Sequence, residues 1–209
     1  MNHIINNYFE NVFVIAHPES QRFQAFNERW EGLNYRLCQF VMQGLNCVSK
    51  DGLAVHNLPS IPNDIPLLDP LSDGQVACAL AHMLIYQIIA NENLSNCLIL
   101  EDDSVFNTLS NLEIALNSDY DILALFTADC DLYTTPHLAS PYTDKYTRAG
   151  TSAYVIRTSN IACDLYESQV KKMNTADGVI MRSDKKIYAV YPPVCSCDDS
   201  PSIIVNGFY

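Results

Sequence analysis

Acidic side chains follow two neighbouring apolar segments of this 209-residue chain at the points where those segments end. Glu101, Asp102 and Asp103 come directly after the apolar residues 97–100, and Asp129 follows the apolar residues 122–126. Continuous apolar runs of this length are typical of strands buried on both faces of a sheet. Ligands of open α/β sheets bind beyond the carboxyl ends of the strands, so both groups of acids are expected at the binding edge.

Three consecutive carboxylates at a strand end repel one another, since two charges ~4 Å apart cost ~4 kcal/mol at an effective dielectric near 20. Such a cluster favours a bound cation. Oxygen ligands without paired thiolates or histidines suit Mg²⁺ or Mn²⁺, ions that complete their coordination with water and substrate phosphates. The sequence therefore predicts a nucleotide diphosphate site at residues 101–103, and a solvated acidic turn is the alternative.

The elements that must position these acids alternate between strand and helix patterns, which favours an α/β fold with a largely parallel sheet flanked by helices. No repeat or linker divides the chain, so we expect one domain over residues 1–209. The irregular residues 132–149 are interpreted as a candidate lid. Strands are expected at 12–16, within 37–48, and at 97–100, 122–126, 153–157, 187–191 and 203–205, and helices around 23–30, 74–91, 109–116 and 158–171.

Composition excludes several partners. Twelve Lys and Arg against 24 Asp and Glu give a net charge of −12, which repels nucleic acids and anionic membranes. The most apolar stretch, residues 76–90, is shorter than the ~20 residues of a transmembrane segment. The first residues lack the features of a secretory signal, so a cytoplasmic location and reduced thiols for the eight cysteines are expected. The Cys195–Cys197 spacing does not fit a zinc knuckle.

Two segments together resemble the central signature of glycosyltransferase family 25. Residues 71–82 read Leu-Ser-Asp-Gly-Gln-Val-Ala-Cys-Ala-Leu-Ala-His, and residues 99–103 read Ile-Leu-Glu-Asp-Asp. Weaker similarity at residues 12–22, 150–156 and 176–180 extends the resemblance over about residues 12–205. The chain departs from the family pattern by carrying Gln75 in place of Glu, Ala81 in place of Ser and Ser104 in place of an apolar residue.

The resemblance implies a GT-A-like nucleotide-sugar-binding fold in which residues 101–103 act as the metal motif. It implies Asp103 as the direct ligand of Mn²⁺ or Mg²⁺, with Asp102 and Glu101 at ribose, a bound water or a second coordination position. The implied donor is a UDP-sugar, and the implied reaction moves a hexose, galactose or glucose, to a hydroxyl of a glycan or protein acceptor, with inversion. The metal would stabilise the negative charge of the leaving UDP.

An inverting transfer also needs a carboxylate that takes the proton of the acceptor hydroxyl. Asp177, which matches a later Asp of the family, is the first candidate, and a plain turn residue before Gly178 is the alternative. Asp129 is the second candidate, with a turn or cap role as its alternative. Arg22, beside Ser20 after the first strand, is expected either at a phosphate or in an ion pair. His82 is expected to be a hydrogen-bonded core histidine with at most a supporting role.

Two other functions remain open at this point. One is a nucleotide-sugar-binding protein of the same fold whose departures at Gln75 and Ala81 accompany reduced or lost catalysis. The other is a nucleotidyltransferase or phosphohydrolase, because acidic clusters on α/β sheets serve several phosphate chemistries. The chain has only seven glycines and no glycine-rich phosphate loop, which argues against this second alternative.

Overall fold

The computed structural model describes most of the chain. The described residues are 2–16, 20–41, 44–49, 54–56, 65–66, 71, 73–109, 112–126, 137–141, 150–191 and 193–198. Of the expected features, Asp129, the strand at 203–205, and residues 132–136 and 142–149 of the candidate lid lie outside these residues.

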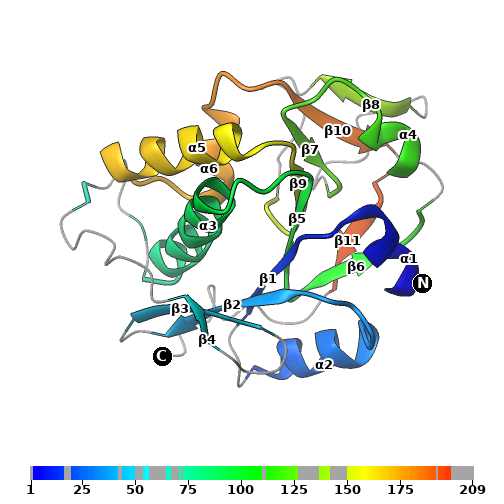
Figure 1. The fold of residues 1–209 in the computed structure, drawn as a ribbon, viewed down its shortest axis with the longest axis horizontal. Coiled ribbons are helices and arrows are strands. Elements are labelled where there is room, and N and C mark those ends of the chain that lie inside the picture. Colours follow the sequence, from blue (N-terminus) through cyan, green and yellow to red (C-terminus); the bar gives the residue numbers. More distant parts are fainter. Residues whose placement is uncertain are drawn as a thin grey trace.

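Helices and strands alternate along the described part of the chain (Figure 1). The helices are α1 (Asn2–Tyr8), α2 (Gln21–Arg29), α3 (Asp73–Asn91), α4 (Leu112–Leu116), α5 (Ser159–Lys171) and α6 (Ala176–Met181). The strands are β1 (Val12–Ala16), β2 (Arg36–Val41), β3 (Gly44–Ser49), β4 (Ala54–His56), β5 (Cys97–Glu101), β6 (Ser104–Phe106), β7 (Ile122–Ala124), β8 (His137–Pro141), β9 (Ala153–Ile156), β10 (Ile187–Tyr191) and β11 (Cys195–Cys197).

The main sheet has the strand order β4-β3-β2-β1-β5-β9-β7-β10-β8. In its centre, β1 pairs in parallel with β2 and β5, and β7 pairs in parallel with β10. Strand β9 lies between β5 and β7 and is antiparallel to both, so β5 and β7 run in the same direction. The prediction of an α/β fold with a mostly parallel central sheet is confirmed, and the arrangement is consistent with a GT-A-like fold. A separate ribbon joins β11 to β6.

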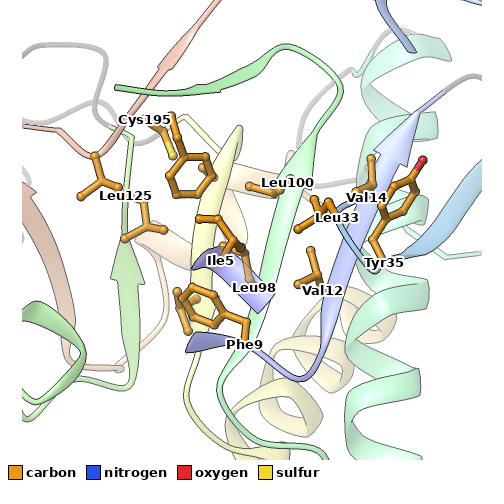
Figure 2. Close-up of a cluster of buried hydrophobic side chains, with 14 of the residues drawn as sticks. Ile5, Phe9, Val12, Val14, Leu33, Tyr35, Leu98, Leu100, Leu125 and Cys195 are labelled. Atoms are coloured by element: carbon orange, nitrogen blue, oxygen red, sulfur yellow. The ribbon is translucent and has the colours of Figure 1, made fainter. Parts of the chain in front are cut away.

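Side-chain alternation along the central strands produces two separate cores. Val12, Val14, Leu98 and Leu100 belong to one cluster, which α1, α2 and α4 cover. Figure 2 shows these residues of β1 and β5 beside Ile5 and Phe9, which come from α1 and the residue after it. The intervening residues of the strands, such as Ile99, belong to the opposite cluster with α3, α5 and α6. Figure 1 shows these three helices together on one side of the sheet.

Helix α3 is buried nearly all round, as its apolar sequence predicts. Ile85, Ile88 and Ile89 pack in the cluster on the sheet, whereas Ala79 and Met83 pack against Met173, which follows α5. None of the helices among the described residues is long and apolar enough to cross a membrane. The 19 residues of α3 are thus accounted for by packing between the sheet and α5.

The structure differs from the sequence-based expectations at several elements. Residues 37–48 were expected to hold one strand, but they form most of an antiparallel pair, β2 and β3. Residues 137–141 of the expected irregular loop form an edge strand, β8, against β10. Helices α1 and α6 and strands β4, β6 and β11 were not predicted, and Asp177 was expected in a loop rather than in α6; each of these elements is too short to show a clear hydrophobic period.

The core packing leads to a stability prediction. Ile99 of β5 is fully buried, whereas Ile114 of α4 is 54% exposed. We expect Ile99→Ala to lower the free energy of unfolding by about 2–5 kcal/mol, because it removes buried apolar atoms and leaves a cavity. The matched change Ile114→Ala should shift it by less than about 0.5 kcal/mol. Urea denaturation of both variants measures the difference, and equal effects would contradict the assigned core.

Candidate functional site

Glu101, Asp102 and Asp103, the acid cluster, lie where β5 ends. Glu101 is the last residue of β5 and stands in register with Ile15 of the parallel strand β1. Its backbone N–H donates to the carbonyl of Ser152, which precedes the antiparallel strand β9. The cluster therefore lies at the sheet edge formed by the carboxyl ends of β1 and β5 and the amino end of β9, as predicted for the acids after residue 100.

Asp102 and Asp103 turn toward the start of α2. Ser20 caps α2, because its Oγ accepts from the N–H of Phe23 at 3.0 Å, and the same hydroxyl donates to Asp102 Oδ2 at 3.2 Å. Arg22 Nη2 lies 3.1 Å from Asp102 Oδ1 and 2.7 Å from Asp103 Oδ2. The Arg22 side chain is only 11% exposed, so this is a largely buried ion pair.

Glu101 points to the opposite face of the sheet, toward α3. Its Oε1 lies 3.4 Å from Nε2 of His82 and accepts from the hydroxyl of Thr151 at 2.5 Å. This separation follows from the alternation of side chains at the end of a strand. Two consecutive carboxylates, Glu101 and Asp102, therefore have different counter-groups on different helices.

His82 is the centre of a buried polar chain. Its Nδ1 lies 2.7 Å from the hydroxyl of Tyr154, which in turn lies 3.1 Å from the hydroxyl of Tyr86. The His82 and Tyr154 rings are stacked, with centroids 5.7 Å apart. The sequence-based expectation of a hydrogen-bonded core histidine agrees with this environment, and its contact with Glu101 links the core to the acid cluster.

Hydrogen bonds from α2 and from the end of the β6–β11 ribbon hold the turn that carries the acid cluster. The N–H of Asp198, just after β11, donates to the carbonyl of Asp103 at 2.8 Å. Arg29, at the end of α2, donates to the carbonyl of Ser104 at 3.0 Å and to Asp198 Oδ2 at 2.7 Å. The turn that carries the acids is thus fixed from both α2 and β11.

Burial and charge act differently on the three acids. Burial raises the pKa of Glu101, but the hydrogen bond and charge of His82 and the hydrogen bond of Thr151 outweigh it, and the net pKa is lowered. Burial raises the pKa of Asp102 more than the nearby Arg22 lowers it. Burial, together with the charge of Glu101, raises the pKa of Asp103 to about 6 despite Arg22. Asp103 therefore carries the least stabilised negative charge.

Two atoms in this site are buried without a hydrogen-bond partner among the described residues, namely Asp103 Oδ1 and Arg22 Nε. An unpartnered carboxylate oxygen beside two further carboxylates fits a hard divalent cation such as Mg²⁺ or Mn²⁺. An unpartnered guanidinium N–H fits an anionic oxygen, which a phosphate supplies. The residues present thus suit both parts of a metal–diphosphate group.

Asp177 lies in the first turn of α6, whose start is capped by Thr175. The charges of Asp177 and of the acid cluster both raise the pKa of the Cys78 thiol, so Asp177 lies near that thiol, on the α3 side of the sheet. Of the sequence-predicted site residues, the structure therefore gathers Ser20, Arg22 and the acid cluster and adds Asp177 nearby. Asp129 lies outside the described residues.

Thr151, Tyr154, Tyr86, Arg29 and Asp198 were missed by sequence reasoning. Thr151 and Tyr154 lie in the family-like segment 150–156, and nothing in their spacing reveals that β9 runs antiparallel and brings its amino end to the acids. Asp198 follows the Cys-Ser-Cys segment, in which Cys195 and Cys197 are free thiols. Pairing with β6, which only the tertiary structure reveals, brings Asp198 to the site.

The raised pKa of Asp103 gives a pH dependence. The folded protein holds this proton up to about pH 6, whereas the ordinary value is 3.8, so stability contributed by the protonated acid falls as the pH rises between these values. Without divalent cations, we expect the free energy of unfolding of the wild type to fall between pH 4 and pH 7.5 relative to that of Asp103→Asn. The relative loss should reach up to about 3 kcal/mol. Urea denaturation of both proteins in the presence of EDTA, at several pH values, measures this difference. A difference in free energy of unfolding that does not change with pH would contradict the assignment.

Comparisons with known proteins give the family. A solved structure described as the crystal structure of A197 from STIV is 12% identical and matches 86% of this chain and 80% of that one, at a TM-score of 0.42, which carries no argument about function. A comparison with curated proteins found no match. Residues 9–183 match the family described as glycosyltransferase family 25 (LPS biosynthesis protein). With the acid cluster, Ser20, Arg22 and Asp177 inside the matched region, the chain belongs to glycosyltransferase family 25.

Proposed function

We propose that this glycosyltransferase moves a hexose, galactose or glucose, from a UDP-sugar to a hydroxyl of a glycan or protein acceptor, in a reaction that depends on Mn²⁺ or Mg²⁺. The observation that carries the proposal is the unpartnered Asp103 Oδ1, buried within three consecutive carboxylates at the carboxyl edge of the sheet. Membership in family 25 supports the transfer of a sugar, and the carboxylates support the metal.

The residues of the acid cluster and Arg22 each bind a different part of the donor. Asp103, with Asp102, would bind the divalent cation, which when bound supplies positive charge to the diphosphate leaving group. Glu101, kept ionised by His82 and Thr151, accepts hydrogen bonds from the ribose hydroxyls or from a bound water. Arg22 has donors that its ion pairs do not use, and these bind phosphate oxygens.

Asp177 is the proposed general base. As the acceptor oxygen bonds to the anomeric carbon and the bond from that carbon to UDP breaks, the carboxylate of Asp177 takes the hydroxyl proton. Attack from the face opposite the leaving group inverts the anomeric configuration. Asp177 is half-buried on α6, and its charge acts together with that of Glu101 on the Cys78 thiol, so it lies near the end of β5, which supports this role.

Donor binding is tested by thermal shift with UDP, GDP and CDP, each with and without Mn²⁺. Ligands that bind the folded state raise its apparent stability by mass action, so we expect UDP with Mn²⁺ to give the largest shift. Asp103→Asn should abolish the Mn²⁺-dependent part of the shift. The control Asp119→Asn removes an acid that is 82% exposed and precedes β7, and it should keep the full shift.

The metal and donor assignment is wrong if no nucleotide shifts the wild type, or if Asp103→Asn responds to UDP and Mn²⁺ like the wild type. Release of UDP from UDP-galactose or UDP-glucose without acceptor separates an enzyme from a nucleotide-sugar-binding protein that has lost catalysis. We expect slow, Mn²⁺-dependent release. A UDP shift without any turnover would favour the binding protein instead.

The role of Asp177 is tested by separating binding from turnover. Asp177→Asn removes the proton acceptor but keeps a side chain of the same shape, so we expect a 10²–10⁴-fold fall in turnover, as is typical for loss of a general base. The UDP thermal shift should be unchanged, because Asp177 does not hold the donor. Unchanged turnover would remove Asp177 from the mechanism, and Asp129 would be the next residue to substitute.

A further inference from the structure

A second group of potential metal ligands lies behind the acid cluster, on the α3 side of the sheet. Cys78 and His82 of α3 and Glu101 of β5 each offer one ligand atom, and these atoms all lie within 4.8 Å of one another. Nε2 of His82 and Oε1 of Glu101 are 3.4 Å apart. Ligand atoms around a tetrahedral zinc ion are about 3.5 Å apart, so small side-chain rotations complete the geometry.

The backbone fixes this arrangement. Cys78 and His82 are four residues apart, so they lie on one face of α3, one turn from each other. Glu101 reaches the same face because side chains alternate along β5, and Ile99, two residues earlier, packs in the cluster that contains Leu84 and Ile85 of α3. Helix and strand are therefore held together by a packed core next to the three ligands.

The supporting hydrogen bonds are those of a metal-bound histidine. A ligating histidine usually uses its other ring nitrogen in a hydrogen bond that fixes the ring and the tautomer. Nδ1 of His82 lies 2.7 Å from the hydroxyl of Tyr154, which Tyr86 contacts in turn. Without metal, Nε2–H donates to Glu101; with metal, Nε2 would carry no proton, and Nδ1–H would donate to the Tyr154 hydroxyl. Thr151 holds the Glu101 carboxylate in place by donating to Oε1.

The charge around Cys78 also favours a cation. Burial and then the charges of Glu101, Asp177, Asp103 and Asp102 raise the pKa of its thiol, so the thiol lies in a strongly negative environment. Among the described residues, none provides the thiol with a hydrogen-bond partner. A divalent cation would neutralise part of this charge and supply the missing partner.

We propose that Cys78, His82 and Glu101 bind Zn²⁺, separately from the Mg²⁺ or Mn²⁺ proposed at Asp103. One sulfur, one nitrogen and one oxygen ligand match the preferences of zinc, whereas Mg²⁺ and Mn²⁺ prefer oxygen ligands alone. On binding, the S–H bond of Cys78 breaks, its proton passes to solvent, and the sulfur bonds to the metal. Water fills the remaining tetrahedral position. This inference does not depend on the proposed function.

The test uses the whole 209-residue chain, purified without a histidine tag. We expect about one equivalent of zinc by mass spectrometry, and after replacement by Co²⁺ a thiolate-to-cobalt charge-transfer band. Cys78→Ser should lose the band and at least ten-fold in zinc affinity. Asp103→Asn should keep both, because Asp103 is not one of the three ligands. The matched control Cys163→Ser changes a cysteine on α5, outside the cluster, and should also keep both.

Wild-type protein that is folded by circular dichroism and yet gives no charge-transfer band with Co²⁺ would overturn the proposal. In that case the contact between His82 and Glu101 is a hydrogen bond and nothing more. A band that survives Cys78→Ser but disappears in Cys195→Ser or Cys197→Ser would also overturn it, by placing the thiolate ligand in the ribbon. Failure of the UDP and Mn²⁺ experiment, in contrast, leaves this outcome unaffected.

Discussion

The site depends on the separation of two adjacent carboxylates onto opposite faces of one strand end. Glu101 faces α3, where His82 and Thr151 stabilise its charge, and Asp102 faces α2, where Ser20 and Arg22 do the same. If they shared one face, their charges would lie within a few ångströms of each other in a partly buried site, where repulsion is strong. Side-chain alternation gives each acid its own counter-group, and the packed sheet maintains that division.

The same constraint explains why α2 starts where it does. Ser20 both caps the helix and donates to Asp102, so the first turn of α2 cannot move without disturbing the acid. The N-terminus of a helix carries partial positive charge, which favours the nearby carboxylate. Arg22, in that first turn, extends over both Asp102 and Asp103. Helix start, cap and counter-ion thus form one structural unit with the acid cluster.

The sequence predicted the main features of this architecture, for reasons that can be stated. The apolar runs at β1 and β5 are continuous because both faces of the sheet are covered, and the all-apolar helix α3 is buried between the sheet and α5. The acids at 101–103 were predicted at the binding edge because they follow such a run. The antiparallel pairing of β2 with β3 was not predicted, since residues 37–48 were interpreted as a single strand.

Other parts of the site depend on long-range contacts that a local pattern does not contain. The direction of β9 is set by its pairing with β5 and β7, and this direction alone determines that Thr151 meets Glu101. Tyr86 and Tyr154 meet across a helix and a strand, although each alone is an ordinary core residue. Cys78 likewise approaches Glu101 only because α3 lies across the end of β5.

The bond from the N–H of Asp198 to the carbonyl of Asp103 has a consequence for biosynthesis. Strands β5 and β6 leave the ribosome together, but β11 and Asp198, which close the acidic turn, are translated about ninety residues later. A nascent chain can therefore form the β1–β5 pair while this turn still lacks one of its anchors. The proposed donor site would then be completed late in translation, after most of the sheet has already folded.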